Sequence, residues 1–299
     1  MIVESPIDEI LKRGSIADVA VHWLPSMGSF QFLADPFGLW RNGVLHVFVE
    51  TYDYRVRVGA IETLTFDSTF RLLNRQVVLK RPWHLSYPFV FEGEGETWML
   101  PEAHRSNALT LYRAIDFPFG WEAAGSIALD DVAVDATPLF HEGLWWLFFS
   151  SAARDVDKMR TLHAAWAERM AGPWHMHPQN PLRVDVSGAR PGGTPVIIDG
   201  RITLPVQDCS RTYGGAIRPL VIERLSTEHF EARAGDSIKA PQRFAPFVEG
   251  LHTLSSAGPI TLIDAKRTEL SAHGLAIEIR RETRKLVQRL RRPPAINAR

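Results

Sequence analysis

The sequence has little cysteine, no long apolar run and no excess charge of either sign. Cys209 is the single cysteine in 299 residues, which excludes an internal disulfide and a cysteine-rich zinc or iron–sulfur site. No segment approaches the ~20 consecutive apolar residues of a membrane span, and the acidic start of the chain is unlike a secretory signal. The 34 basic and 34 acidic side chains cancel, which argues against a general nucleic-acid binder. We therefore expect a soluble, cytoplasmic protein without a nucleic-acid partner.

Several enzyme motifs are also missing. The chain has no G-x-x-x-x-G-K-[ST], no G-x-G-x-x-G after a strand and no G-x-S-x-G, which argues against nucleotide hydrolysis, Rossmann dehydrogenation and α/β-hydrolase chemistry. His175-Met176-His177 and Asp155-Val156-Asp157 formally match metal-binding patterns. Both are too short to be specific, and we interpret them as structural and turn residues. The sequence predicts no metal and no cofactor.

The chain does contain a repeat of about 50 residues, a period typical of propeller blades. Pro36, Pro88, Pro138 and Pro195 lie 52, 50 and 57 residues apart, and each begins a short apolar run, a polar turn and a second apolar run. The turn residues accept positive φ at low cost and are typical of hairpins. They are Asn42-Gly43, Glu94-Gly95, Glu142-Gly143 and Asp199-Gly200. A fifth, weaker unit covers residues 251–264.

Further strand-like runs between these hairpins give about four strands per unit. Five antiparallel units predict an all-β fold, a five-bladed β-propeller over residues 1–265, with a β-sandwich as the alternative. Residues 266–299 place leucines and isoleucines among arginines and lysines, which predicts a short basic amphipathic helix and tail. That helix either packs against the propeller with its polar face in solvent or contacts a membrane surface or a protein.

Polar residues are expected to converge where the innermost strands of a propeller meet. The first strands of the units begin near Asp35, Tyr87, Asp135 and Arg190. The second strands end in Glu50, Glu102 and Asp208, which lie 14, 14 and 13 residues after their prolines and are interpreted as equivalent positions. Several carboxylates from different blades suit glycosidic bond cleavage, which uses one protonated acid and one ionised base or nucleophile. Each of these acids also has a structural explanation, as a turn residue or as the partner of a nearby basic side chain.

Two of these segments resemble a known enzyme family. Asp35-Pro36, and residues 135–140 followed by residues 143–147, are similar to the five-bladed propellers of glycoside hydrolase family 43 and its relatives in families 32 and 68. The resemblance implies that Asp35 is the base or nucleophile and that Asp135 tunes its pKa and orients the substrate. The acidic glutamate of the family is missing, because Arg190 stands in the corresponding stretch, so the acid role passes to Glu102 or Asp208. Relatives often hold calcium at this place, but no dedicated ligand loop is evident here.

A second resemblance covers residues 30–264. Its motifs look like the propeller domain at the N-terminus of plant glucosamine inositolphosphorylceramide transferases. A similar domain occurs in bacterial proteins near polysaccharide and formyltransferase genes. The motifs are Ser86–Phe91, Met99–Glu102, Leu111–Arg113, Gly172–Trp174 with His177-Pro178, Ala189–Gly193, and Gln207–Ser210 with Tyr213-Gly214.

These observations predict a carbohydrate-active enzyme that cleaves or transfers a glycosyl unit and binds a carbohydrate or nucleotide-sugar. The catalytic candidates are Asp35, Glu102, Asp135 and Asp208. The substrate-binding candidates are Tyr87, His104, Arg190, Gln207, Tyr213 and His252. The alternative is a non-catalytic sugar-binding propeller that assists a separate glycosyl- or formyltransferase. A third hypothesis is a scaffold that binds proteins through the basic C-terminal helix.

Overall fold

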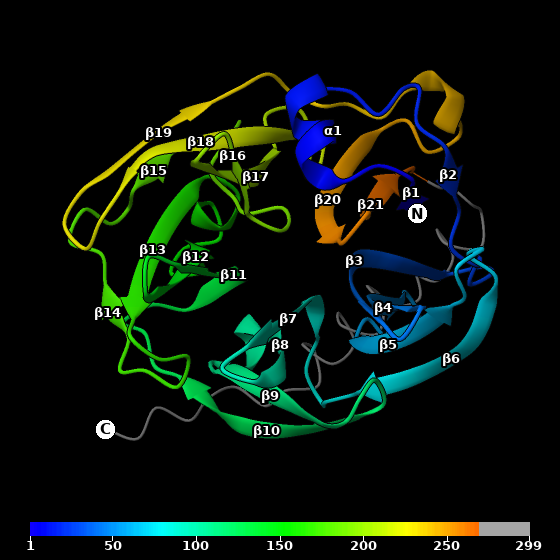
Figure 1. The fold of residues 1–299 in the computed structure, drawn as a ribbon, viewed down its shortest axis with the longest axis horizontal. Helices are drawn as coiled ribbons and strands as arrows, with labels where there is room; N and C mark the ends of the chain where they lie inside the picture. Colours follow the sequence, from blue (N-terminus) through cyan, green and yellow to red (C-terminus); the bar gives the residue numbers. More distant parts are fainter. Residues whose placement is uncertain (269–299) are drawn as a thin grey trace, which may run out of the picture.

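Five antiparallel sheets are arranged as blades around a common centre in the computed structural model, which describes residues 1–268 (Figure 1). The five-bladed β-propeller predicted from the repeat is confirmed, and the β-sandwich alternative is wrong. The last strand ends at Lys266. The predicted C-terminal helix lies almost entirely in residues 269–299, outside the described residues, and stays a prediction.

Four blades follow one another along the chain, and in each the first strand is innermost. The first blade contains β3 (Gln31–Arg41), β4 (Val44–Asp53), β5 (Gly59–Phe66) and β6 (Leu72–Leu79). The second contains β7 (Ser86–Gly93), β8 (Glu96–Glu102), β9 (Leu109–Asp116) and β10 (Gly120–Ile127). The third contains β11 (Ala133–His141), β12 (Leu144–Ser151), β13 (Thr161–Ala167), β14 (His175–Met176) and β15 (Arg183–Val184). The fourth contains β16 (Val196–Ile198), β17 (Arg201–Asp208), β18 (Ala216–Leu225) and β19 (Phe230–Ala234).

The predicted hairpin turns are present in all four blades. The first residue of each turn has φ between 49° and 54°, and the glycine after it has φ between 75° and 81°. Two successive positive φ values match the right-handed twist of the flanking strands, and Asn-Gly and Asp-Gly adopt them readily. The turn chemistry therefore fixes where each innermost strand ends and its neighbour begins.

The fifth blade joins the two ends of the described chain. It pairs β20 (Gly250–Ala257) and β21 (Ile260–Lys266) with β1 (Ile2–Val3) and β2 (Val21–His22), in the order β2-β1-β21-β20. In Figure 1 the blue β1 accordingly lies beside the orange β21, and β2 forms the outer edge of this blade. The sequence analysis included these residues in the propeller but did not foresee that they complete the last blade.

A short helix fills the connection between β1 and β2. This helix, α1 (Ile7–Arg13), buries Ile7, Ile10 and Leu11 and ends at Gly14, which has a φ of 67°. The described part of the chain also contains three 3₁₀ turns, η1 (His104–Ser106), η2 (Asp157–Met159) and η3 (Gln242–Phe244). Within residues 1–268, no helix is long and apolar enough to cross a membrane.

Apolar side chains pack between neighbouring blades. One cluster joins the first three blades through residues such as Phe37, Phe89 and Leu147, and another joins the third and fourth through Phe148 and Leu204. Further clusters close the ring between the fourth, fifth and first blades. Because every blade is held by its neighbours, the positions of the innermost strands are fixed relative to one another.

We predict that Ile2 contributes strongly to ring closure. Ile2 is 1 % exposed and pairs with Leu262 of β21. Ile2→Ala removes buried apolar atoms and should lower the free energy of unfolding by about 2–5 kcal/mol, measured by chemical denaturation. Ile115→Ala is the matched control, because Ile115 is 63 % exposed. An equal effect of the two substitutions would contradict a special role for β1.

Candidate functional site

The innermost strands of the first three blades share a β-bulge that carries a polar side chain. Asp35, Tyr87 and Asp135 stand at these bulges, where the strand register shifts, with φ values of 48°, 44° and 51°. Positive φ is costly for residues other than glycine and persists only where the surrounding structure imposes it. The sequence analysis predicted these three positions. The bulges show, however, that the third repeat aligns on Asp135 and that Ala136, rather than Pro138, stands where the first two blades have proline.

Asp35 forms an ion pair across the junction of the first and fifth blades. Its Oδ1 lies 2.9 Å from Nδ1 of His252 and accepts a hydrogen bond of 2.7 Å from the hydroxyl of Thr253. Its Oδ2 accepts a hydrogen bond of 3.1 Å from the backbone N–H of Tyr87. Burial alone would raise the pKa of Asp35, but the charge and hydrogen bonds of these neighbours outweigh it and lower the pKa. Asp35 is therefore held ionised.

His252 carries the compensating positive charge. Burial opposes its protonation, but Tyr213, Asp35 and Asp264 hold the pKa of His252 well above its usual value. Nδ1 of His252 also lies 3.4 Å from Oδ2 of Asp264, and Nε2 lies 2.5 Å from the hydroxyl oxygen of Tyr213. A protonated imidazole donates through both ring nitrogens, which satisfies these acidic and hydroxyl partners together.

A second buried ion pair joins the third and fourth blades. Nε of Arg190 donates to Oδ2 of Asp135 at 2.7 Å, and Nε2 of Gln207 donates to the same oxygen at 3.0 Å. Burial raises the pKa of Asp135, and the charge of Arg190 offsets part of that rise. Nη2 of Arg190 donates to the hydroxyl oxygen of Tyr213 at 3.3 Å. Through Tyr213 and His252, polar contacts run without interruption from Asp135 to Asp35.

Glu50 is a buried acid of β4, beside Asp35, and the strand continues three residues beyond the end predicted for it at Glu50. Burial, followed by the negative charge of Asp35, raises the pKa of Glu50 well above its usual value. His84 has Nε2 3.5 Å from Oε1 of Glu50, and its Nδ1 accepts the backbone N–H of Gly59 at 2.9 Å. Nδ1 is thus an acceptor, which places the proton of neutral His84 on Nε2, facing Glu50. Burial and the nearby charge of Asp35 outweigh this long contact, so the pKa of Glu50 stays raised and its protonated form is favoured.

Glu102 occupies the equivalent position at the end of β8 but has the opposite charge state. Burial would raise its pKa, yet the ring and backbone N–H of His104 lower it, with donor–acceptor distances of 2.5 and 2.9 Å to Oε1. Ser86 donates to Oε2 at 3.1 Å. Nε2 of His104 lies 3.4 Å from Nζ of Lys158, at the end of η2. Glu102 is therefore an ionised carboxylate.

Tyr87 and Asp208 lie differently from the other predicted residues. The side chain of Tyr87 is completely buried, and its hydroxyl contacts Thr137 and the N–H of Gly193, each at 2.9 Å. Tyr87 thus links three blades and positions them, away from any ligand surface. Asp208 accepts hydrogen bonds from Ser210 and Ser237 at 2.5 and 3.0 Å, outside the Asp35–Asp135 network. Successive strand residues face opposite sides, so Gln207, not Asp208, reaches Asp135.

Comparisons with known proteins agree with this geometry. The family model described as "Glucosamine inositolphosphorylceramide transferase 1, N-terminal" matches residues 17–244. The chain belongs to this family. Glucosamine inositolphosphorylceramide transferase 1 of Oryza sativa subsp. indica is 37 % identical over 215 residues, which are 69 % of this chain and 28 % of the relative. The protein of the same name from Arabidopsis thaliana is 33 % identical over 250 residues, 79 % of this chain and 32 % of the relative.

The family resemblance predicted from the motifs is thus confirmed, although the chain spans only about a third or less of these relatives. Solved structures extend the likeness of the fold. The catalytic domain of a GH62 α-L-arabinofuranosidase from Coprinopsis cinerea has a TM-score of 0.58 at 13 % identity, covering 84 % of this chain and 90 % of that one. A family 117 glycoside hydrolase from Zobellia galactanivorans has a TM-score of 0.54 at 14 % identity, covering 70 % of each chain. At such identities the likeness shows a shared propeller fold.

Several residues of this site were not predicted from the sequence. Glu50 was noted only as the equivalent of Glu102, and that equivalence was the signal that it belongs to the site. Nothing in the local sequence singles out His84, Lys158 or Asp264, because each comes from a loop or strand far along the chain from its partner. These contacts arise only when the blades close into a ring.

Within residues 1–268, the side chains of Asp35, His252 and Asp264 lie close enough together to hold a metal ion. Each offers one potential ligand atom, and these three atoms lie within 4.8 Å of one another. Nδ1 of His252 faces both carboxylates, so a proton on Nδ1 and a metal ion would compete for the same position. The chemistry proposed below requires no metal ion. The two short histidine and aspartate patterns make structural contacts instead: His177 with Ser226, and Asp157 with Arg154.

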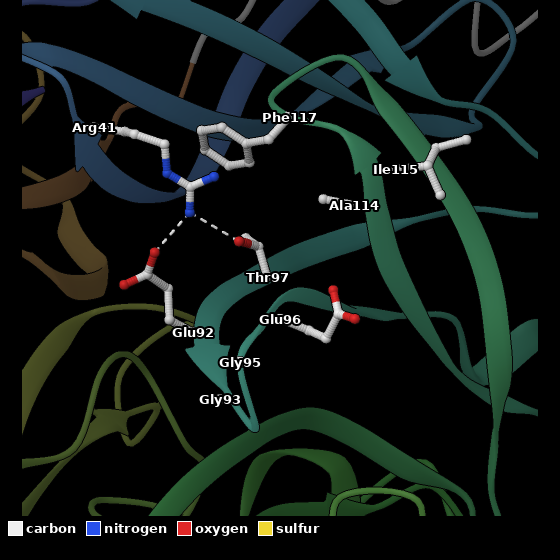
Figure 2. Close-up of a pocket in the computed structure, with 9 residues that line it drawn as sticks. All are labelled: Arg41, Glu92, Gly93, Gly95, Glu96, Thr97, Ala114, Ile115 and Phe117. Atoms are coloured by element: carbon white, nitrogen blue, oxygen red, sulfur yellow. Dashed lines mark hydrogen bonds and ion pairs between the residues drawn. The ribbon is translucent and has the colours of Figure 1, made fainter.

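A separate cavity of about 480 Å³ lies at the hairpin ends of the first two blades (Figure 2). Nη2 of Arg41 donates to Glu92 at 2.6 Å and to Thr97 at 2.9 Å, and the guanidinium lies 4.1 Å from the centre of the Phe117 ring. Arg41 ends β3, whereas Asp35 stands near its other end, so this cavity is distinct from the carboxylate site.

We predict that Glu50 makes stability fall as the pH rises. A raised pKa in the folded state means that stability is fully present below the unfolded pKa, near 4.5, and is lost as the pH rises through the folded value. Glu50→Gln imitates the protonated form and should therefore be more stable than the wild type at pH 8 but not at pH 4. Denaturation at both values tests this, with exposed Glu142→Gln as control. Parallel profiles for wild type and Glu50→Gln would contradict a protonated Glu50.

We also predict a large cost for removing Arg190. Arg190→Met leaves the Asp135 charge buried without its partner and should lower the free energy of unfolding by about 3–5 kcal/mol. The double variant Asp135→Asn/Arg190→Met removes that charge and should recover much of the loss. Arg55→Met, at an exposed ion pair with Asp53, is the control and should change little. Failure of the double variant to recover would show that the arginine acts through other contacts.

Proposed function

We propose that the chain is a carbohydrate-active protein that cleaves or transfers a glycosidic bond with Asp35 as base or nucleophile and Glu50 as proton donor. The observation that carries this proposal is the pair of neighbouring buried carboxyl groups whose pKa values are shifted in opposite directions. Two titratable groups separated in this way identify the ionised and protonated partners of acid–base chemistry. Glycoside cleavage requires such a pair.

The remaining residues support these two roles. His252 and Thr253 keep Asp35 ionised through contacts to Oδ1, and the backbone N–H of Tyr87 holds Oδ2, so both oxygens of the carboxylate are fixed. Neutral His84 faces Glu50 with a proton on Nε2 and can donate a hydrogen bond to the carboxylate that forms when Glu50 gives up its proton. Glu102, which His104 keeps ionised, can accept hydrogen bonds from sugar hydroxyls. His104 and Lys158 can also contact these hydroxyls, because their side chains are 25 % and 23 % exposed. We assign the acid role to Glu50 in place of Glu102 or Asp208, because Glu102 is ionised and Asp208 lies outside the network.

The comparisons support a carbohydrate ligand. The curated relatives carry the name glucosamine inositolphosphorylceramide transferase 1, and the solved neighbours include glycoside hydrolases. The ligand is therefore proposed to be a carbohydrate or nucleotide-sugar, and the reaction a hydrolysis or a transfer to a second hydroxyl.

Turnover of a panel of 4-nitrophenyl and methyl glycosides tests the proposal. Asp35→Asn should lower kcat by at least about 100-fold on every substrate that the wild type cleaves, as expected for loss of a base. Glu50→Gln should lower it much more on methyl glycosides than on nitrophenyl glycosides, because nitrophenolate leaves without protonation. Glu142→Gln, 80 % exposed at a hairpin end, is the control.

The pH dependence gives an independent check. Activity should fall on the acidic side as Asp35 becomes protonated and on the alkaline side as Glu50 loses its proton, which gives a bell-shaped profile. Glu50→Gln should lose the alkaline limb and keep the acidic one. Unchanged turnover in both Asp35→Asn and Glu50→Gln would overturn the assignment.

A non-catalytic glycan-binding propeller is the second candidate, and a specific observation favours it. Arg190, tied to Asp135, stands in the stretch where the resembling hydrolases carry their acidic glutamate. The chain also matches only the smaller part of its curated relatives. This candidate predicts saturable sugar binding without turnover, and binding that survives Asp35→Asn and Glu50→Gln.

A further inference from the structure

Three aromatic rings gather at the end of the first blade that also carries Asp35 and Glu50. Phe32 of β3 and Tyr52 of β4 are direct cross-strand partners, and their rings stack with centroids 5.0 Å apart and planes 25° apart. Tyr54 lies edge-on to both, with centroids 5.6 Å from Phe32 and 5.3 Å from Tyr52. We call these three residues the aromatic platform.

The aromatic platform is continuous with the carboxylate site. Tyr52 follows Glu50 by two residues on β4, so the two side chains project from the same face of the strand. The Tyr52 ring lies 5.7 Å from the ring of His84, whose Nε2 lies 3.5 Å from Glu50. Platform and acid therefore face one region.

The platform is open to solvent, whereas the acids beside it are not. Tyr54 is 49 % exposed and Phe32 and Tyr52 are partly exposed, while Asp35 and Glu50 are 3 % and 6 % exposed. An aromatic ring presents a flat apolar face with negative potential. The C–H face of a pyranose ring is flat, apolar and slightly positive, which complements it. A sugar whose linkage oxygen approaches Glu50 thus has its next ring directed toward an aromatic surface.

We propose that Phe32, Tyr52 and Tyr54 form a sugar-stacking subsite that holds the second pyranose ring of a carbohydrate whose glycosidic linkage lies at Asp35 and Glu50. The inference rests on the proposed function for the placement of the linkage. It adds that the ligand contains at least two pyranose rings and that a disaccharide binds better than its monosaccharide.

Binding is measured by saturation-transfer NMR titration with methyl glycosides and β-1,4-linked disaccharides of glucose, glucosamine, galactose, mannose and glucuronic acid. At least one disaccharide should bind the wild type more tightly than its methyl glycoside. Tyr54→Ala should weaken that disaccharide by about three- to tenfold, the range of an aromatic contact, and leave the methyl glycoside unchanged. Tyr54→Trp should retain the preference, because it keeps a stacking face.

Phe140→Ala is the matched control. Phe140 is 55 % exposed and packs 5.2 Å from Trp145 at the hairpin end of β11, away from the bulge that carries Asp135. It should change neither affinity. A second platform variant, Tyr52→Leu, checked by its thermal unfolding, should also abolish the disaccharide preference.

The proposal is overturned if no disaccharide in the panel is preferred by the wild type, or if Tyr54→Ala and Tyr52→Leu both keep the preference. Equal weakening of methyl glycoside and disaccharide would also overturn it, because that result assigns the rings a purely structural role. The same titration in the double variant Asp35→Asn/Glu50→Gln separates the two proposals. If this variant keeps the disaccharide preference and the wild type shows no turnover, the platform stands and the catalytic assignment is removed.

Discussion

The ion pair between Asp35 and His252 joins the two blades at which the ring closes. Asp35 belongs to the first blade, and His252 belongs to the fifth, whose outer strands come from the beginning of the chain. A buried carboxylate is tolerated only when a partner charge and hydrogen bonds compensate for its lost hydration. The pair therefore exists only when the ring is complete, and the charge state of Asp35 depends on that closure.

The two glutamates Glu50 of β4 and Glu102 of β8 show how surroundings, not residue type, set acidity. Glu102 ends the second strand of its blade, Glu50 lies three residues before the end of its strand, and both are buried. His104 follows Glu102 closely enough to donate from both its ring and its backbone, which stabilises the ionised form. Glu50 has only the longer contact with neutral His84 and lies beside the negative charge of Asp35. The first blade thus supplies a carboxylic acid, Glu50, and the second blade a carboxylate, Glu102.

Arg190 and Tyr87 are two positions at which the blades depart from the repeat and make contacts specific to the centre of the ring. Arg190 neutralises Asp135 and reaches Tyr213, so the fourth blade contributes a cation to the network where the first and third blades contribute acids. Tyr87 stands at a bulge equivalent to those of two aspartates, but its buried ring and hydroxyl hold the second, third and fourth blades together. Position 193 requires glycine, because a Cβ there would lie 1.7 Å from the carbonyl oxygen of Leu254. Departures from the repeat are therefore where the centre acquires its specific contacts.

The sequence by itself determined the blades, because hairpin turns and strand periodicity are local properties that recur every fifty residues or so. It also located Asp35, Asp135 and Arg190, since these stand at fixed places within the repeat. Only the tertiary structure decided that β1 and β2 complete the fifth blade, that Gln207 rather than Asp208 faces Asp135, and that Glu50 is the protonated acid. Each of these depends on which side chains meet across blades. The pKa of a buried group is set by neighbours that can lie more than two hundred residues away in the chain, as Thr253 lies 218 residues from Asp35.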